Sequence, residues 1–185
     1  KSRLSSIENQ SRRRAESRLD PHTVSLVGYT NAGKSTLLSC LSGSKTYIAN
    51  QLFATLDTKV RYWVLEDKRI VMLADTVGFV RDLPHHLVAS FHATLEETIN
   101  ADLLLHVCDS SSPDLELQMK AVDEVLIKLG NISQPCILVF NKIDRVDFAQ
   151  ESWLREQYPD AVFVSAIDGN GLDTLDAVLA STLDR

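Results

Sequence analysis

The chain has 185 residues, of which 44% are hydrophobic, and a formal net charge of −6. This length suits one well-buried domain and excludes two domains of ordinary size. The charge is uneven, because residues 1–20 carry +3 and residues 21–185 carry −9. An acidic body is a poor nucleic-acid surface, since phosphate binding needs clustered cations. No apolar run approaches the ~20 residues that span a bilayer, and no secretory signal opens the chain, so we expect a soluble, monomeric, cytoplasmic protein.

Three cysteines, Cys40, Cys108 and Cys136, are widely spaced and stand in apolar runs. An odd number at such spacings does not form a metal-binding or redox pattern. We expect buried, reduced thiols in the core.

Residues 1–20 are polar and show no apolar stripe, which predicts the end of a helical linker or a tail. Their arginine run, Arg12–Arg14, could contact RNA, but a solvated charged face is the favoured interpretation. From Thr23 onward, apolar runs alternate with helical patterns. Residues 24–27 predict a buried strand, and residues 35–41 predict the helix that follows it across a glycine-rich turn.

Two apolar runs, residues 60–65 and 70–74, flank a turn-like Glu66–Arg69 and predict an antiparallel hairpin. A third run covers residues 103–108 and is followed by a helix that we expect to begin at Pro113 and to end at Gly130. The apolar face of that helix has 3.6-residue periodicity and comprises Leu115, Met119, Val122, Leu126 and Leu129. Two more strands, at 137–140 and 161–164, and a helix at 172–183 complete the pattern.

This alternation predicts an α/β fold: a three-layer α/β/α sandwich around a mostly parallel six-stranded sheet with one antiparallel edge strand. Residues 21–185 would form this single domain. In such folds ligands bind at the carboxyl ends of the strands, so chemistry is expected there.

The first motif, Gly28–Ser35, fits G-x-x-x-x-G-K-[ST] and lies between a strand and a helix, which predicts a P-loop NTPase. Its glycines let backbone N–H groups surround phosphate oxygens at the positive end of the helix. Lys34 is expected to reach the β- and γ-phosphates, and the Ser35 hydroxyl to bind Mg²⁺. The predicted phosphate-contacting residues are Gly28, Tyr29, Thr30, Asn31, Ala32, Gly33, Lys34, Ser35 and Thr36.

The second motif, Asp75-Thr76-Val77-Gly78, ends the 70–74 strand. Asp75 is expected to help hold Mg²⁺ through water, and Gly78 to offer its N–H to a γ-phosphate. Between the P-loop and the hairpin, Phe53-Ala54-Thr55-Leu56-Asp57 supplies the threonine that folds over Mg²⁺ and γ-phosphate in the triphosphate state. Thr55 is the preferred candidate and Thr58 the competing one. The predicted metal ligands are Ser35, Thr55 and Asp75, and the predicted catalytic residues are Lys34, Thr55, Gly78 and Asn31.

The third motif, Asn141-Lys142-Ile143-Asp144, follows the 137–140 strand. A carboxylate at Asp144 can accept from both N1–H and the exocyclic amine of guanine, and adenine lacks these donors. Asn141 could tie the P-loop to the base loop, and the Lys142 stem could cover the base. Ser165-Ala166, at the end of the last strand, could present a backbone N–H to guanine O6.

Together these segments resemble one family, the HflX GTPases. The resemblance runs over residues 24–183 and is dense in Gly-Tyr-Thr-Asn-Ala-Gly-Lys-Ser-Thr (28–36), Gln-Leu-Phe-Ala-Thr-Leu-Asp (51–57), Asp-Thr-Val-Gly-Phe (75–79) and Ala-Thr-Leu-Glu-Glu (93–97). All GTPases share the individual nucleotide motifs, whereas Gly-Tyr-Thr-Asn and the stretch from Val77 to Glu97 are much more specific to this family. Lys59 departs from the pattern, which has a proline near this place. The resemblance implies a GTPase that binds the large (50S) ribosomal subunit, with ribosomal RNA contacted by regions outside this chain, and that rescues or splits stalled ribosomes.

One group expected for efficient hydrolysis is missing from the sequence motif, because Phe79 stands where Ras-like enzymes have a glutamine that orients the attacking water. We therefore expect slow turnover that the ribosome stimulates. Related GTPases with Asn at the Asn31 position coordinate K⁺, so the resemblance implies stimulation of hydrolysis by K⁺; the alternative is that Asn31 only braces the loop. Three alternatives stay open: an Obg- or Era-like GTPase in ribosome assembly, a slow G domain that acts mainly as a nucleotide-gated binding module, and an ATP-using P-loop kinase.

Overall fold

The computed structural model describes residues 21–43, 60–75, 100–128 and 134–184. The expectations for residues 1–20, Leu129 and Gly130 fall outside these ranges. The described strands form one six-stranded sheet in the order β2-β3-β1-β4-β5-β6. Only β2 is antiparallel to its neighbour, so the expectation of a mostly parallel sheet with one antiparallel edge strand is confirmed.

The strands are short apolar runs that begin and end close to the predicted bounds. They are β1 (His22–Val27), β2 (Val60–Val64), β3 (Ile70–Asp75), β4 (Leu103–Asp109), β5 (Cys136–Asn141) and β6 (Val162–Phe163). In β4, alternate side chains face opposite layers: Leu103, Leu105 and Val107 join one core cluster, and Leu104 joins another. Because both faces are covered, the strand reads as a continuous apolar run rather than an alternating one.

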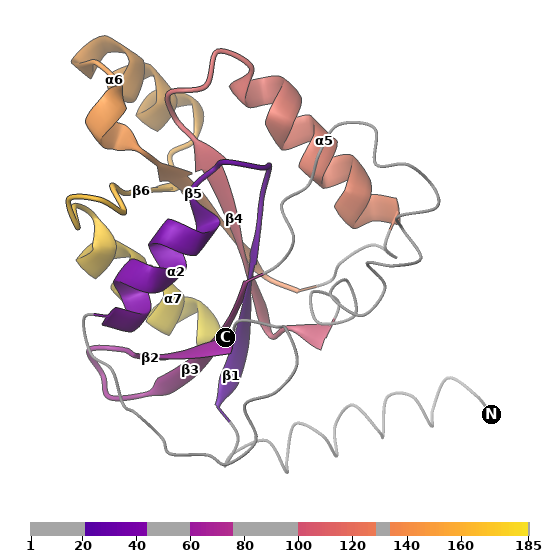
Figure 1. The fold of residues 1–185 in the computed structure, drawn as a ribbon, viewed down its shortest axis with the longest axis vertical. Coiled ribbons are helices and arrows are strands. Elements are labelled where there is room, and N and C mark those ends of the chain that lie inside the picture. Colours follow the sequence, from indigo (N-terminus) through magenta and orange to yellow (C-terminus); the bar gives the residue numbers. More distant parts are fainter. Residues whose placement is uncertain (1–20, 44–59, 76–99, 129–133, 185) are drawn as a thin grey trace.

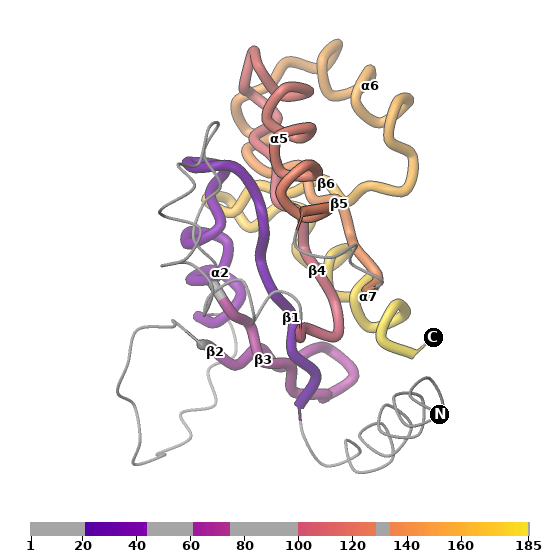
Figure 2. The backbone as a smooth tube through the Cα atoms, turned by 90° about the vertical axis from the view of Figure 1, so that its right-hand side faces the viewer, coloured from indigo at the N-terminus to yellow at the C-terminus, as the bar shows by residue number. Residues whose placement is uncertain are grey.

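In the described part of the chain, α-helices cover both faces of the sheet (Figure 1). Leucines of α2 (Lys34–Gly43) and α7 (Leu172–Leu183) belong to the largest core cluster. Side chains of α5 (Leu115–Lys128) and Leu154 of α6 (Phe148–Gln157) pack on the opposite face. This is the predicted three-layer arrangement. In Figure 2, α6 lies at one end of the molecule and the β2–β3 hairpin towards the other.

Two sequence predictions need correction. The helix α5 begins at Leu115, not at Pro113, because a tight turn precedes it: the Leu115 N–H donates to the Ser112 carbonyl (3.3 Å), and the first full helical bond runs from Gln118 N to Asp114 O (2.9 Å). Pro113 lies in that turn.

The cysteines are also not all buried. Cys108 is buried, whereas Cys40 is half-buried and Cys136 is exposed at the start of β5. Within the described ranges no group of three or more His, Cys, Asp or Glu side chains is arranged to hold a metal ion. No helix in the same part of the chain is both long and apolar enough to cross a bilayer.

Candidate nucleotide-binding site

The sheet register brings the predicted motifs to one edge. Leu26 pairs with Asp75, so the second motif begins beside the strand that leads into the P-loop. Val27 pairs with His106, and Asp109 pairs with Asn141. The ends of β1, β3, β4 and β5 therefore meet at the carboxyl edge, where parallel sheets place their ligands.

The P-loop leaves β1 at Gly28 and enters α2 at Lys34. Both glycines are required by close contacts as well as by left-handed backbone. A Cβ atom on Gly28 (φ 152°) would lie 2.2 Å from the carbonyl oxygen of Val107, and one on Gly33 (φ 94°) would lie 2.3 Å from Nδ2 of Asn141. Both distances are far below a van der Waals contact, so only glycine lets the loop pack against β4 and β5.

Lys34 is the centre of this loop. Its side chain is buried, and Nζ donates to the carbonyl oxygens of Gly28 and Tyr29, each at 2.9 Å. The ammonium group thus holds the loop curled around itself. Ser35 and Thr36 follow in the first turn of α2 and are exposed. This helix start carries the partial positive charge and the N–H groups that suit a phosphate anion.

Asn31 and Thr30 lie on the exposed part of the loop, and Ala32 is buried beneath it. Asn31 has φ 64°, a left-handed conformation that asparagine tolerates better than most residues. Its carbonyl oxygen accepts a hydrogen bond from Lys142 Nζ (2.7 Å). The P-loop is therefore tied at this residue to the loop that follows β5.

Asn141 connects three segments through one buried amide. Its Nδ2 donates to the carbonyl oxygen of Ala32 (3.0 Å), and its Oδ1 accepts from the N–H of Ala166 (3.1 Å). The residue is 1% exposed. Because both ends of the amide are satisfied by backbone groups far apart in sequence, the side chain fixes the P-loop, the β5 loop and the β6 loop relative to one another.

The guanine-reading group expected at Asp144 lies in the short 3-10 helix η1 (Ile143–Arg145). Its Oδ1 accepts from the Ser165 hydroxyl (2.7 Å), and Arg145 Nε lies 3.8 Å from Oδ2. The carboxylate is thus oriented by the β6 loop. The backbone N–H groups of Ser165 and Ala166, one of which is expected to face guanine O6, both have partners in this structure: Ser165 N donates to Asn170 O (3.0 Å) and Ala166 N to Asn141 Oδ1.

Asp109 belongs to this network and was not singled out from the sequence. Lys142 Nζ lies 2.6 Å from its Oδ2, and the hydroxyl and N–H of Ser111 donate to its Oδ1 at 2.6 and 3.0 Å. Burial alone would raise the pKa of this carboxyl, but the hydrogen bonds from Lys142 and Ser111 outweigh it and hold the pKa below its usual range. The signal in the sequence is an aspartate directly after the 103–108 run.

His106 is a second buried polar residue near the P-loop. Its Nε2 is buried without a hydrogen-bond partner, and its Nδ1 lies 3.8 Å from Oδ1 of the exposed Asp123. Burial, with a further contribution from the charge of Lys34, lowers the pKa of His106 to about 4. Desolvation and the Lys34 charge both disfavour the protonated form, so the imidazole is neutral at neutral pH.

The remaining predicted site residues lie outside the described ranges. They are Phe53, Ala54, Thr55, Leu56, Asp57, Thr76, Val77 and Gly78, with the competing Thr58 and with Phe79. The backbone of Asp75 is described as the last residue of β3.

Three loops meet at one edge of the sheet: the P-loop after β1, the Asn-Lys-x-Asp loop after β5 and the Ser-Ala loop after β6. Together they define a guanine-nucleotide-binding P-loop domain. A family model described as 50S ribosome-binding GTPase matches residues 23–142. The chain is 45% identical to GTPase HflX of Gluconacetobacter diazotrophicus over 90% of this chain and 37% of that protein, and 45% identical to GTPase HflX of Escherichia coli over 98% and 44%. The chain therefore belongs to the 50S ribosome-binding GTPase family and, within it, to the HflX GTPases.

The fold comparison agrees. The crystal structure of a GTP-binding protein from the hyperthermophilic archaeon Sulfolobus solfataricus in complex with GDP matches with a TM-score of 0.72 and 27% sequence identity, over 99% of this chain and 61% of that chain. The chain spans less than half of the length of the two HflX relatives.

Proposed function

We propose that this chain binds GTP, hydrolyses it to GDP and phosphate, and acts as a cytoplasmic nucleotide switch on the large ribosomal subunit, in the rescue or splitting of stalled ribosomes. The observation that carries the nucleotide part is the Asn141 amide, which joins the phosphate-binding loop to the two loops expected to read the base. A side chain 1% exposed and bonded at both ends pre-organises these loops before any ligand arrives.

Guanine selection is assigned to Asp144. Its carboxylate is held by Ser165, and its acceptors would be left unpaired by adenine. This argues against the ATP-using kinase. A competition assay tests it: unlabelled GTP should displace a fluorescent GDP from the chain at concentrations at least about a hundredfold lower than ATP does. Equal displacement by the two nucleotides would contradict the assignment.

Mg²⁺ fits the residues proposed to hold it. Ser35 is exposed at the start of α2, and Leu26 pairs with Asp75, so hydroxyl and carboxylate residues stand on adjacent segments of one edge. Mg²⁺ prefers hard oxygen ligands, and proteins usually supply only one or two of them, while phosphates and water fill the other coordination positions. When bound, the ion would neutralise charge on the β- and γ-phosphates; Thr55 is proposed as the ligand that completes the site.

Catalysis is proposed to rest on Lys34, Asn31, Thr55 and Gly78. Lys34 would stabilise charge on the phosphates, Thr55 and Gly78 would contact the γ-phosphate, and Asn31 would help to hold K⁺. The exposed, left-handed Asn31 on the outer part of the P-loop is compatible with an ion-facing side chain. Single-turnover hydrolysis should be faster in KCl than in NaCl; equal rates would remove K⁺ from the proposal.

The ribosomal part is tested by the same assay with purified 50S subunits. We expect hydrolysis to be slow for the 185-residue chain alone and at least about tenfold faster for the full-length protein with subunits, because Phe79 offers no hydrogen bond to an attacking water. Slow hydrolysis that subunits do not change, with tight GTP binding retained, would favour the nucleotide-gated binding module. Stimulation by a ribosome-assembly intermediate instead would favour the Obg- or Era-like role.

A further inference from the structure

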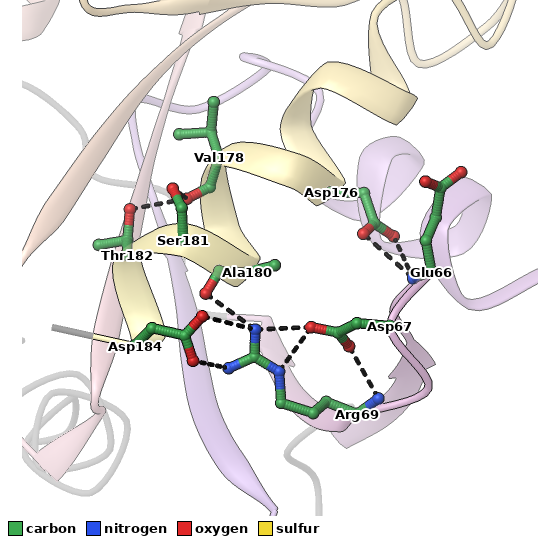
Figure 3. Close-up of polar contacts among 9 residues, drawn as sticks. All are labelled: Glu66, Asp67, Arg69, Asp176, Val178, Ala180, Ser181, Thr182 and Asp184. Atoms are coloured by element: carbon green, nitrogen blue, oxygen red, sulfur yellow. Dashed lines mark hydrogen bonds and ion pairs between the residues drawn. The ribbon is translucent and has the colours of Figure 1, made fainter.

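A cluster of polar contacts lies away from the nucleotide edge, between the β2–β3 turn and α7 (Figure 3). The guanidinium of Arg69 donates from Nε to Asp67 Oδ2 (2.7 Å), from Nη1 to Asp184 Oδ1 (2.8 Å) and from Nη2 to the carbonyl oxygen of Ala180 (2.9 Å). The hydrogen bond from Arg69 holds the pKa of Asp67 below its usual range. One side chain therefore joins its own turn to the last turns of α7.

Asp176 makes the second connection. The residue is 6% exposed, and both of its carboxylate oxygens accept from the backbone N–H of Glu66, at 3.1 and 3.2 Å. Asp176, Ala180 and Asp184 are spaced four residues apart, so they follow one face of the helix. Arg69 meets this face at the C-terminal end of α7, where a cation and an unsatisfied carbonyl attract each other.

These contacts join two elements that both lead to the nucleotide. The strand β2 begins directly after residues 44–59, which carry Thr55, and β3 ends at Asp75, where the second motif starts. The helix α7 follows the Ser165–Gly171 loop, which orients Asp144. The turn that carries Arg69 is at the far end of β3 from Asp75, roughly 17 Å away for a six-residue strand, so it has no part in holding the ligand.

We propose that Arg69, Asp176 and Asp184 form a latch that restrains the β2–β3 hairpin against α7 and thereby sets the relative affinity for GTP and GDP. This inference rests on the proposed function as a GTP switch. On the proposed function, triphosphate would engage the segments at both ends of the hairpin through Thr55 and Gly78, and GDP lacks the phosphate that these two residues would contact. Engagement of those two segments would draw the hairpin along β1, and a strand that keeps the same side chains on each face of the sheet would shift by two residues, roughly 7 Å. Such a shift would separate Arg69 and Glu66 from their partners on α7, so the latch would oppose the triphosphate-bound position.

The decisive variant is Asp184→Asn, which replaces one carboxylate of the latch at an exposed position. Arg69→Gln tests the other partner of the same contact. Glu151→Gln is the matched control, since it makes the same charge change in an Arg155 ion pair of 2.7 Å on α6. For each 185-residue chain, dissociation constants for GDP and for a non-hydrolysable GTP analogue are measured, together with hydrogen exchange of residues 61–75 and 172–184.

Both latch variants should raise the affinity for the GTP analogue relative to GDP by about threefold or more, and speed hydrogen exchange in the hairpin and in the last turns of α7, while Glu151→Gln matches the wild type. A relative affinity that is unchanged or lower in the latch variants, with GTP binding intact in the wild type, overturns the latch alone. Failure of the wild-type chain to bind GTP selectively overturns the proposed function instead.

Discussion

At the residue scale, Asp109 shows how one carboxylate serves two loops. It holds Lys142, and Lys142 in turn donates to the Asn31 carbonyl of the P-loop. Asp109 therefore acts through Lys142 as a positioning residue, and the Lys142 ammonium is directed to the loop rather than over the base. The lysine stem remains available to cover the nucleotide.

We predict that Asp109→Asn weakens binding of GDP and GTP by about three- to tenfold, because it replaces a charge-assisted hydrogen bond with a neutral one and loosens Lys142. Stopped-flow dissociation of a fluorescent GDP measures this as a faster off-rate. Asp114→Asn is the control, since it makes the same charge change at an exposed position in the turn before α5. Equal off-rates for Asp109→Asn and the wild type would show that nucleotide binding does not depend on the contact between Asp109 and Lys142.

At the element scale, the turn between β6 and α7 holds two glycines in left-handed backbone. Gly171 has φ 76°, and a Cβ atom there would lie 2.0 Å from the carbonyl oxygen of Phe163. Gly169 has φ 80°, and nothing lies within 4 Å of the corresponding Cβ position. An alanine at position 169 would therefore meet only the cost of the left-handed backbone, whereas one at position 171 would also meet a steric clash.

Gly169→Ala should lower the free energy of unfolding by about 1 kcal/mol, the cost of left-handed alanine. Gly171→Ala should lower it by about 3 kcal/mol, because the added methyl group also displaces the end of β6. Urea unfolding at neutral pH measures both values. Similar losses in the two variants would mean that the turn relaxes freely around Gly171.

Helices and strands were predictable from the sequence where the pattern that indicates them lies within a short segment of the chain. The hairpin was expected from two apolar runs around Glu66–Arg69, and β2 and β3 pair in antiparallel register there. The start of α5 was misplaced because proline suits the first turn of a helix in general. In the structure, the hydrogen bond from Leu115 N to Ser112 O forms a separate turn that contains Pro113, and the helix begins only after it.

At the scale of the whole molecule, the buried His106 couples the stability of the domain to pH. Its pKa is about 4 in the folded chain, against about 6.5 when unfolded. Between these values the unfolded chain binds a proton that the folded chain does not. Stability from this residue is therefore fully present above pH 6.5 and is lost as the pH falls towards 4, by about 3 kcal/mol in total.

The test is His106→Met, which keeps an apolar volume beside Cys108, Leu115 and Met119 and removes the titrating group. Carboxylates elsewhere titrate in both proteins, so the comparison isolates the histidine. Unfolding free energies measured from pH 7.5 to 4 should fall more steeply for the wild type, and the difference between the two proteins should change by about 3 kcal/mol. Parallel curves would show that folding does not shift the pKa of His106.

The sequence by itself determined the succession of strands and helices along the chain, and the motifs at their ends, because both depend on periodicity and spacing within short segments. Only the tertiary structure decided which side chains connect those segments. Asn141 meets Ala32, and Arg69 meets Asp184, across more than a hundred residues of chain. No local pattern encodes such pairs, since they exist only after the sheet order and the packing of α7 have brought the partners together.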